Sequence, residues 1–374
     1  MLLRTVVDYT TTMRLYAFGS NGSGQLGIGH TSDTNIPQVC PLPDHLPGLP
    51  KSIVAGGNHT LLLFNDGTMF YSGSSRDGSM QTEFAPSAAH TFQRAYISTL
   101  NKDVKLCSAW WDGSVFVDTS DSVYTAGPGS KGEQGIKGSP NSTGLQELQN
   151  FPPAESQQIG TIVDVNSSVD HTVVVLADGT VWGWGNGRKG QLTGSRAITW
   201  APRRFEHSKQ SVARAVCGRD FTFLMYKNGT HEVLNTNKWA LQEDAPEPTS
   251  DWKDVSASWG SIFILKEDGK VESWGRNDHG QLAPPGLPDI EQLAVGSEHV
   301  VALTKDGRVV SWGWGKHGNC GVDIDENGDV NGKWNEVPVD QSDIVLGVGA
   351  GCATSFFWTK TLVTPIERLD TDTN

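Results

Sequence analysis

Residues 290–321 read IEQLAVGSEHVVALTKDGRVVSWGWGKHGNCG, and this stretch is the most informative about the fold. It contains a strand-like run, the string Gly-Ser-Glu-His, an apolar run, the pair Asp306-Gly307, another strand-like run and a Gly-rich loop. An Asp-Gly pair between alternating apolar runs is the strongest short-range hairpin pattern, and it predicts a type I′ turn with positive φ at both central residues. The stretch therefore reads as one complete β module.

The same module recurs along almost the whole chain. Residues 14–29 match only the end of a unit, and residues 344–358 match only the beginning. Complete units occupy residues 53–80, 104–136, 162–193, 213–242, 252–283 and 290–321. The unit at 213–242 keeps its Asn-Gly turn but has lost the Trp-Gly ending. Six full units and two complementary halves make seven repeats.

These repeats predict a closed ring. A unit of four short strands is too small to cover its own faces, so neighbouring units must bury one another. We predict an all-β fold, a seven-bladed β-propeller closed by pairing of the N- and C-terminal half-repeats, which removes free sheet edges. The propeller is expected over residues 14–360, between an N-terminal extension (1–13) and a polar C-terminal tail (361–374). The extension is either a disordered tail or the product of an upstream start.

The segments between the units are predicted to be outer loops, where function often resides. They comprise residues 30–50, 81–102, 128–160, 194–211, 235–250 and 322–342.

Composition restricts the function. The chain has 29 Lys and Arg against 42 Asp and Glu, a formal net charge of −13, which argues against a broad nucleic-acid or anionic-membrane footprint. The start is too polar for a secretory signal, and no run approaches the ~18 apolar residues of a membrane span. The five cysteines contain no Cys-x-x-Cys pair and predict free thiols in an intracellular protein rather than a disulfide framework or zinc site; they are Cys40, Cys107, Cys217, Cys320 and Cys352.

No motif predicts catalysis or a cofactor. Three Gly-x-Gly-x-x-Gly strings, at 127–132, 185–190 and 313–318, are followed by turn-rich segments rather than the helix a dinucleotide site needs. Residues 323–334 resemble a calcium loop, but Trp334 stands where the bidentate Glu should be, so an acidic surface loop is expected. The chain has no Gly-x-Ser-x-Gly nucleophile elbow. The prediction is a protein without catalytic residues, cofactor or metal.

Three strings carry a family resemblance. GGNHT with NDGTMFYSG (56–73), VDHTVVVLADGTVWGWGNGRKGQLT (169–193) and GSEHVVALTKDGRVVSWGWGKHGNCG (296–321) closely resemble the regulator-of-chromosome-condensation repeat, over roughly residues 14–360. Within that family, AFGSNGSGQLGIGH (17–30), SWGWGKHGNCG (311–321), GAGCATSFFW (349–358) and the altered unit at 213–242 are similar to a fungal branch of alpha-tubulin suppressors, also known as killer-toxin-insensitivity factors.

The resemblance implies a function. It implies a non-enzymatic scaffold that forms a heterodimer with a small CSL-type zinc-binding protein of the diphthamide pathway, in the cytoplasm and nucleus. The pair would support diphthamide biosynthesis and tRNA wobble-uridine modification, with Elongator contacted indirectly. The alternative is guanine-nucleotide exchange on a small GTPase, as in the founding family member, with the 128–160 insertion as the wedge. An adaptor role in ubiquitin ligation or a tubulin-linked role has no sequence feature for or against it.

The Gly-x-x-His loops are the expected binding region, because a propeller brings them together on one face. The founding family member uses Asp and His at this register against its GTPase. In this chain the register is predicted to hold Asn58-His59, Trp111-Asp112, Asp170-His171, Arg219-Asp220, Trp259, Glu298-His299 and Gly351-Cys352. The recurring histidines are expected to hold neighbouring blades together through hydrogen bonds. Positions that break the repeat are the better candidates for contact with a partner specific to this protein.

Tryptophans stand out among those positions, since aromatic residues dominate interface energetics. Trp110, Trp111 and Trp259 replace small polar residues, with packing between blades as the alternative, and Trp314 precedes Lys316 and His317. Trp182 and Trp312 are predicted to be packing residues. The predicted partner contact comprises Trp110, Trp111, Asp112, Arg219, Asp220, Trp259, Glu298, His299 and Trp314.

Overall fold

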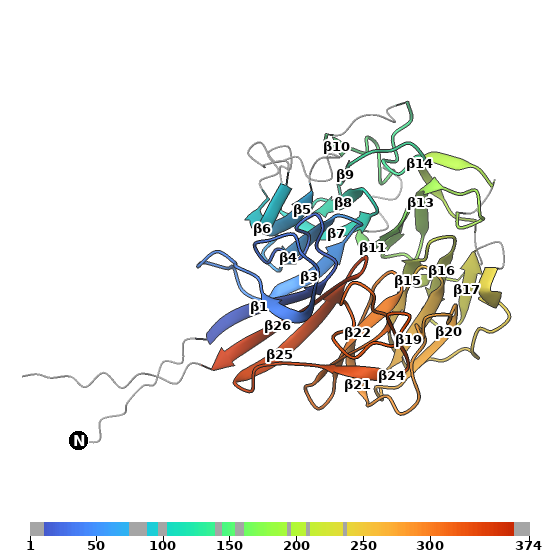
Figure 1. Ribbon diagram of the computed structural model, residues 1–374. Coiled ribbons are helices and arrows are strands. Elements are labelled where there is room, and N and C mark those ends of the chain that lie inside the picture. The colour runs from blue at the N-terminus through green and yellow to red at the C-terminus, as the bar shows by residue number, and fades with distance from the viewer. Residues whose placement is uncertain are drawn as a thin grey trace, which may run out of the picture.

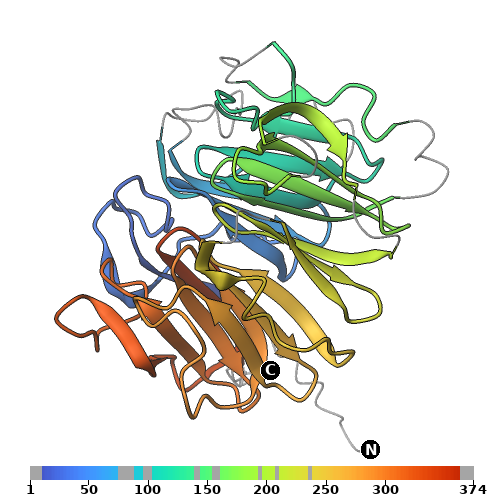
Figure 2. The ribbon, with the colours of Figure 1, turned by 90° about the vertical axis from the view of Figure 1, so that its right-hand side faces the viewer.

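The computed structural model describes residues 11–74, 88–95, 103–138, 144–153, 161–192, 196–206, 210–234 and 238–362. In these parts of the chain the strands form seven antiparallel sheets, arranged as the blades of a ring (Figure 1). Figure 2 shows the blades after a quarter turn. One short 3-10 helix, η1 (Lys238–Ala240), is the non-strand element within the described residues, and no described helix could span a membrane. The predicted all-β seven-bladed propeller is confirmed.

Each blade after the first is built from consecutive strands. Blade 2 contains β3 (Pro50–Ala55), β4 (His59–Phe64), β5 (Met69–Ser74) and β6 (Ala88–Arg94), and blade 3 contains β7 (Val104–Trp110), β8 (Gly113–Asp118), β9 (Val123–Ala126) and β10 (Gln146–Glu147). Blade 4 contains β11 (Ile162–Ser168), β12 (His171–Leu176), β13 (Val181–Asn186) and β14 (Ile198–Arg204). Blade 5 contains β15 (Val212–Cys217), β16 (Thr222–Tyr226) and β17 (His231–Leu234), and blade 6 contains β18 (Trp252–Ala257), β19 (Ser261–Lys266) and β20 (Val271–Gly275). Blade 7 contains β21 (Ile290–Val295), β22 (His299–Thr304), β23 (Val309–Trp314) and β24 (Asp329–Val337).

Blade 1 closes the ring with both ends of the chain. Its strand order is β2 (Thr34–Val39), β1 (Thr11–Gly19), β26 (Thr354–Leu362) and β25 (Asp343–Ala350). β1 pairs with β26 from Thr11 opposite Leu362 to Gly19 opposite Thr354, and the blue and red strands lie side by side in Figure 1. The predicted pairing of the half-repeats is therefore confirmed. The strands extend slightly beyond the predicted limits of 14 and 360, while residues 1–10 and 363–374 lie outside the described part of the chain.

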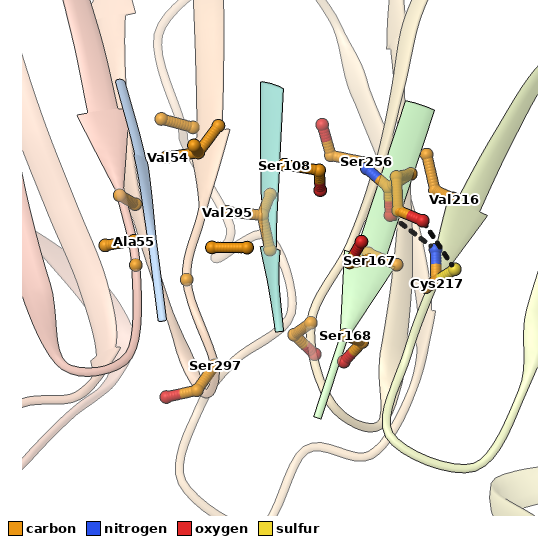
Figure 3. Close-up of a pocket in the computed structure, with 18 of the residues that line it drawn as sticks. Val54, Ala55, Ser108, Ser167, Ser168, Val216, Cys217, Ser256, Val295 and Ser297 are labelled. Atoms are coloured by element: carbon orange, nitrogen blue, oxygen red, sulfur yellow. Dashed lines mark hydrogen bonds between the residues drawn. The ribbon is translucent and has the colours of Figure 1, made fainter. Parts of the chain in front are cut away.

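The first strand of each full blade lies innermost. Neighbouring inner strands contact one another in the cyclic order β25, β3, β7, β11, β15, β18 and β21. They surround a channel of about 460 Å³. Small side chains such as Ser108, Ser167, Ser256 and Val295 line it, from four different blades (Figure 3).

Apolar side chains of neighbouring blades fill the wedges between them. Between blades 2 and 3, Leu61 and Leu63 of β4 pack with Cys107 of β7 and Phe116 of β8. Because each blade completes its neighbour's core, the ring is one cooperative unit.

The Asp-Gly hairpins use a different turn from the predicted one. In blade 7 only Gly307 has positive φ (90°), and its N–H donates to Thr304 O at 2.9 Å. This is a type I turn followed by a left-handed glycine, so the type I′ prediction is wrong. The Asp side chain caps such turns instead: Asp66 Oδ1 accepts from Thr68 N (2.9 Å), and Asp178 Oδ1 accepts from Thr180 N (2.8 Å).

One tryptophan of the third strand fastens each of three blades to the preceding blade. The indole N–H of Trp184 donates to Glu133 O (2.8 Å), that of Trp274 to Leu241 O (2.9 Å), and that of Trp312 to Gln281 O (2.9 Å). The equivalent of Trp312 is therefore Trp184, which is fully buried. The predicted packing residue Trp182 also packs against the core of blades 3 and 4, but it is half-buried and occupies a different repeat position. Grouping Trp182 with Trp312 as packing residues therefore places the two Trp-Gly-Trp-Gly strings (182–185 and 312–315) two residues out of register.

The predicted outer loops supply the outermost strands. β2, β6, β10, β14 and β24 all lie in segments predicted to be loops. In the altered fifth blade, η1 takes the place of the Gly-rich loop, and Ala240 adopts positive φ (50°) where the next unit has Gly280 (φ 70°). Blade 5 therefore keeps the left-handed backbone conformation of the Gly-rich loop at this position, although the glycine is replaced by alanine.

Candidate functional site

Loops between the first and second strands of successive blades form a rim around one end of the channel. Backbone hydrogen bonds link neighbouring loops, from Gly57 N to Trp111 O (2.7 Å), from Trp111 N to Val169 O (3.2 Å) and from Arg219 N to Trp259 O (3.0 Å). The series continues from Trp259 N to Ser297 O (2.8 Å). These bonds place Trp111 and Trp259 on the rim through their backbones, which leaves their side chains to face the channel mouth.

Buried histidines tie the blades together just below this rim. His59 Nε2 lies 2.9 Å from Ser114 Oγ, His171 Nε2 lies 3.1 Å from Thr222 Oγ1, and His299 Nε2 lies 3.0 Å from Ser355 Oγ. Each bond reaches the next blade around the ring. Burial lowers the pKa of all three imidazoles to about 4, so they are neutral at physiological pH.

The loop register differs from the prediction in three blades. A hydrogen bond spans the loop from Gly56 N to His59 O (3.0 Å) and, in blade 5, from Gly218 N to Phe221 O (3.0 Å). Phe221 therefore stands at the histidine position, and Asp220 precedes it. In blade 3, Gly113 begins β8 as His59 begins β4, so Asp112 also precedes that position. In blade 1, Gly351 N donates to Thr354 O (2.9 Å), so Thr354 rather than the predicted Cys352 stands at the histidine position.

Two of the predicted contact residues are buried. Trp110 is 2% exposed and packs among residues of blades 3 and 4, including Val165 and Trp184, and His299 is fully buried. The expectation that Trp110 and His299 offer surface to a partner is therefore corrected. Trp110 follows the alternative of packing between blades, and His299 follows the expected role of pinning them.

The other seven predicted residues lie on or near the rim. Trp111 is 37% exposed and Arg219 is exposed, whereas the rest are half-buried: Asp112, Asp220, Trp259, Glu298 and Trp314.

Trp111 and Trp259 meet although they come from blades 3 and 6. Their ring centroids are 5.7 Å apart with an interplanar angle of 42°. Both residues line the channel on one side and a second cavity of about 490 Å³ on the other. They therefore form a partition between the channel and a pocket that opens on the loop face.

We call this second cavity the mouth pocket. Its described lining comprises Ser20, Gly22, Ser23, Gln25, Gly57, Asn58, Trp111, Trp259, His279, Ser297, Glu298, Trp314, His317, Cys352 and Ala353. The lining combines residues of blades 1, 2, 3, 6 and 7, so only the closed ring assembles it.

Trp314 stands between two imidazoles in the mouth pocket. Its ring centroid is 5.3 Å from that of His317 and 6.5 Å from that of His279. His279 Nδ1 lies 2.9 Å from Asp329 Oδ2, and His317 Nδ1 lies 2.7 Å from Asp33 Oδ2. Trp314 is the last residue of β23, and these neighbouring side chains hold its indole in place.

Stacked cations occupy the neighbouring hollow between blades 5 and 6. The Arg219 guanidinium lies 5.3 Å from the ring centroid of Trp259, and that of Arg276 lies 5.4 Å from the ring centroid of Trp239. Arg276 also forms ion pairs with Glu298 and Asp278. The predicted contact omits Trp239, Arg276, His279 and His317. Aligning the Gly-rich loops of blades 5 and 6 puts Trp239 at the repeat position that His279 occupies in the next unit.

The calcium-like loop gives no sign of a metal site. Asp325 Oδ1 accepts hydrogen bonds from Asn327 N (2.8 Å) and Asp329 N (2.9 Å), so its carboxylate serves the turn itself. Within the described residues no group of three or more His, Cys, Asp or Glu side chains could hold a metal ion.

Comparisons with known proteins agree with this architecture. A family model described as an RCC1-like domain matches residues 14–357. An RCC1 repeat-containing protein of Schizosaccharomyces pombe is 30% identical over 297 residues, which cover 76% of this chain and 83% of that protein. A secretion-regulating guanine nucleotide exchange factor of Mus musculus is 27% identical over 320 residues, covering 77% of this chain and 65% of that protein. The crystal structure of Prp20p from Saccharomyces cerevisiae has a TM-score of 0.80 at 20% identity, covering 94% of this chain and 92% of that one, a likeness of fold alone.

Proposed function

The chain belongs to the RCC1-like domain family, and from this premise we propose that it is a non-enzymatic scaffold whose loop face docks another protein. One observation carries the proposal: the ring closure brings Trp111 and Trp259 together at the mouth of a 490 Å³ pocket. Large aromatic side chains around a pocket, inside a more polar rim, are the usual energetic centre of a protein interface.

The state of the thiols supports a binding role over nucleophilic catalysis. Four of the five cysteines are buried, and Cys352, which lines the mouth pocket, is half-buried. Burial raises the pKa of Cys107 and of Cys352 to about 12, so neither carries a thiolate near neutral pH.

The proposed partner comes from the sequence resemblance. It is the small CSL-type zinc-binding protein of the diphthamide pathway, bound as a heterodimer. The pair would support diphthamide biosynthesis and Elongator-dependent modification of the tRNA wobble uridine. The rim residues Trp111, Asp112, Arg219, Asp220, Trp259, Glu298 and Trp314 are the proposed contact.

Titration calorimetry with the purified zinc protein tests this proposal. We expect Trp111→Ala and Trp259→Ala each to weaken binding by at least about tenfold, since truncating an aromatic anchor costs roughly 2 kcal/mol or more. Trp334→Ala is the matched control, because Trp334 is half-buried on β24 and does not line the mouth pocket. Unchanged affinity in both rim variants, with circular dichroism showing intact folds, would remove this face from the interface.

Guanine-nucleotide exchange is the second candidate, favoured by the similarity to the mouse exchange factor. It would need a segment that displaces nucleotide, and the 128–160 insertion was the predicted wedge. Of that insertion the structure describes residues 128–138 and 144–153, which include β10. Release of a fluorescent guanosine diphosphate analogue from small GTPases distinguishes the two functions: acceleration supports exchange, and an unchanged rate supports the scaffold.

A further inference from the structure

Two walls of the mouth pocket are formed by tryptophans. Trp111 and Trp259 form one wall, and Trp314 contributes another from β23. The faces of indole rings carry partial negative charge, and tryptophan attracts cations more strongly than the other aromatic side chains. The pocket thus offers a surface that suits both the stem and the head of a long basic side chain.

The charges around the pocket have one predominant sign. Glu298 lines it directly, with its side chain only 12% exposed. The two histidines of the lining each lie against a further carboxylate, Asp329 behind His279 and Asp33 behind His317. The lining contains no Lys or Arg among the described residues. Arg276, which pairs with Glu298, reaches it from the neighbouring hollow.

Other tryptophans on this face of the molecule already stack with lysine or arginine side chains of the chain itself. On the side facing blades 5 and 6, Arg219 stacks on Trp259, and both Lys238 (4.9 Å) and Arg276 (5.4 Å) lie over the ring of Trp239. On the mouth-pocket side, no lysine or arginine of the described chain stacks on Trp111 or Trp314. Cations of the chain itself therefore cover the tryptophans of the hollow, whereas none of the described lysines and arginines covers Trp111 or Trp314 in the mouth pocket.

We propose that the mouth pocket binds a lysine or arginine side chain of the docked protein, held between the indoles of Trp111 and Trp314 and close to Glu298. This proposal rests on the proposed scaffold function and specifies the chemistry of its contact. A purely apolar side chain would fill the same volume, but it would lack the attraction between a cation and the faces of the indole rings. The net charge of −13 also favours approach of a basic segment.

Peptide titrations followed by NMR test the proposal on the whole chain. The probes are acetylated and amidated peptides of sequence GSGSXSGSG, with lysine, arginine, norleucine or glutamate at X. We expect lysine and arginine peptides to shift the indole N–H signals of Trp111 and Trp314 saturably, with dissociation constants at least about tenfold lower than that of the norleucine peptide. The buried Trp184 and Trp312 should not respond. Equal binding of the norleucine and lysine peptides, or no saturable shift with any peptide, would overturn the proposal.

Variants assign the effect to the pocket. Trp314→Ala should weaken lysine-peptide binding about tenfold, and Glu298→Gln, which keeps the side-chain shape, should weaken it severalfold. Neither should alter the signal of Trp184. If the peptides fail while the zinc protein still binds through Trp111 and Trp259, docking is real but does not use a basic side chain. If the peptides bind while the zinc protein does not, the pocket has the proposed chemistry and the proposed partner is wrong.

Discussion

At the scale of single residues, glycines after the packing tryptophans have a steric role. Gly185, Gly275 and Gly313 all adopt positive φ, between 98° and 105°. A Cβ on Gly313 would lie 2.7 Å from Glu298 O, and one on Gly185 would lie 2.4 Å from Asp170 O. The Trp-Gly pair therefore allows the third strand to approach the loop that carries the rim residues.

Gly313→Ala tests this role. The substitution combines left-handed strain of about 1 kcal/mol with a backbone clash, so we expect a loss of stability of roughly 2 kcal/mol or more in chemical denaturation. Gly332→Ala is the control, since Gly332 also has positive φ (67°) but its added Cβ would meet nothing within 4 Å. If both variants lose the same stability, the close approach to Glu298 O contributes nothing.

At the scale of elements, one carboxylate joins the chain ends in blade 1. Asp343 Oδ2 accepts hydrogen bonds from Tyr16 of β1 (2.8 Å) and from Thr359 of β26 (2.9 Å), and Asp343 also accepts one from Thr361. Its side chain is fully buried, with Arg14 Nη1 3.6 Å away. Burial by itself would raise the pKa of Asp343, but the hydrogen bonds from Thr361, Tyr16 and Thr359 and the charge of Arg14 outweigh it and lower that pKa.

The sign of this shift predicts an acid-sensitive closure. A depressed carboxyl pKa adds stability above the unfolded-state value near 3.8, and this stability is lost as pH falls through the lower folded-state value. Asp343→Asn should therefore destabilise the chain at pH 7. The variant should also lose less stability than the wild type between pH 7 and acid pH, as measured by urea unfolding at the two pH values. Asp323→Asn removes an exposed partner of Lys333 and should change little. An Asp343→Asn variant with wild-type stability at pH 7 would contradict the role.

At the scale of the whole molecule, the buried histidines make the ring sensitive to acid. The folded-state pKa near 4 lies below the ordinary histidine value of 6.5, so the unfolded chain binds more protons between these values. The stability that the three neutral histidines contribute is fully present above pH 6.5 and is lost as the pH falls towards 4. Each histidine should account for roughly 2 kcal/mol between pH 7 and pH 5.

Replacing one histidine isolates its share. His59→Gln should lower stability at pH 7, through loss of the bond to Ser114, but reduce the further loss between pH 7 and pH 5 relative to the wild type. The exposed His90 serves as control, and His90→Gln should leave both quantities unchanged. An unaltered pH dependence in His59→Gln would show that this imidazole titrates normally.

Ring closure itself can be removed. Deleting residues 354–374 takes away β26 and leaves β1 and β25 with open edges. We expect this truncated chain to self-associate and to lose cooperative thermal unfolding, as followed by light scattering and circular dichroism. Deleting only residues 363–374 leaves every described strand in place and should leave the association state and the cooperative unfolding of the full chain unchanged. A cooperative, monomeric 1–353 chain would mean that blade 1 is not needed for the ring.

The sequence by itself determined the β class, the number of blades and the joining of the two ends. These follow from the period of the repeat and from its two complementary halves, because a local hydrophobic pattern shows which faces each unit must bury. It also identified Trp110, Trp111 and Trp259 as departures from the repeat, and Trp314 as a further candidate contact. Alignment by motif was wrong where the spacing was ambiguous, as with Trp182 and Trp184, because a two-residue shift keeps a side chain on the same face of a strand.

Only the tertiary structure decided which of these residues are accessible. Trp110 and Trp111 are adjacent in sequence, yet one is buried between blades and the other lies on the rim, because β7 ends at Trp110 and Trp111 begins the loop that forms the rim. The meeting of Trp111 with Trp259, and of His317 with Asp33, joins residues far apart in the chain. Such contacts depend on the curvature that closes the ring, and that curvature is a property of all the blades together rather than of any one repeat.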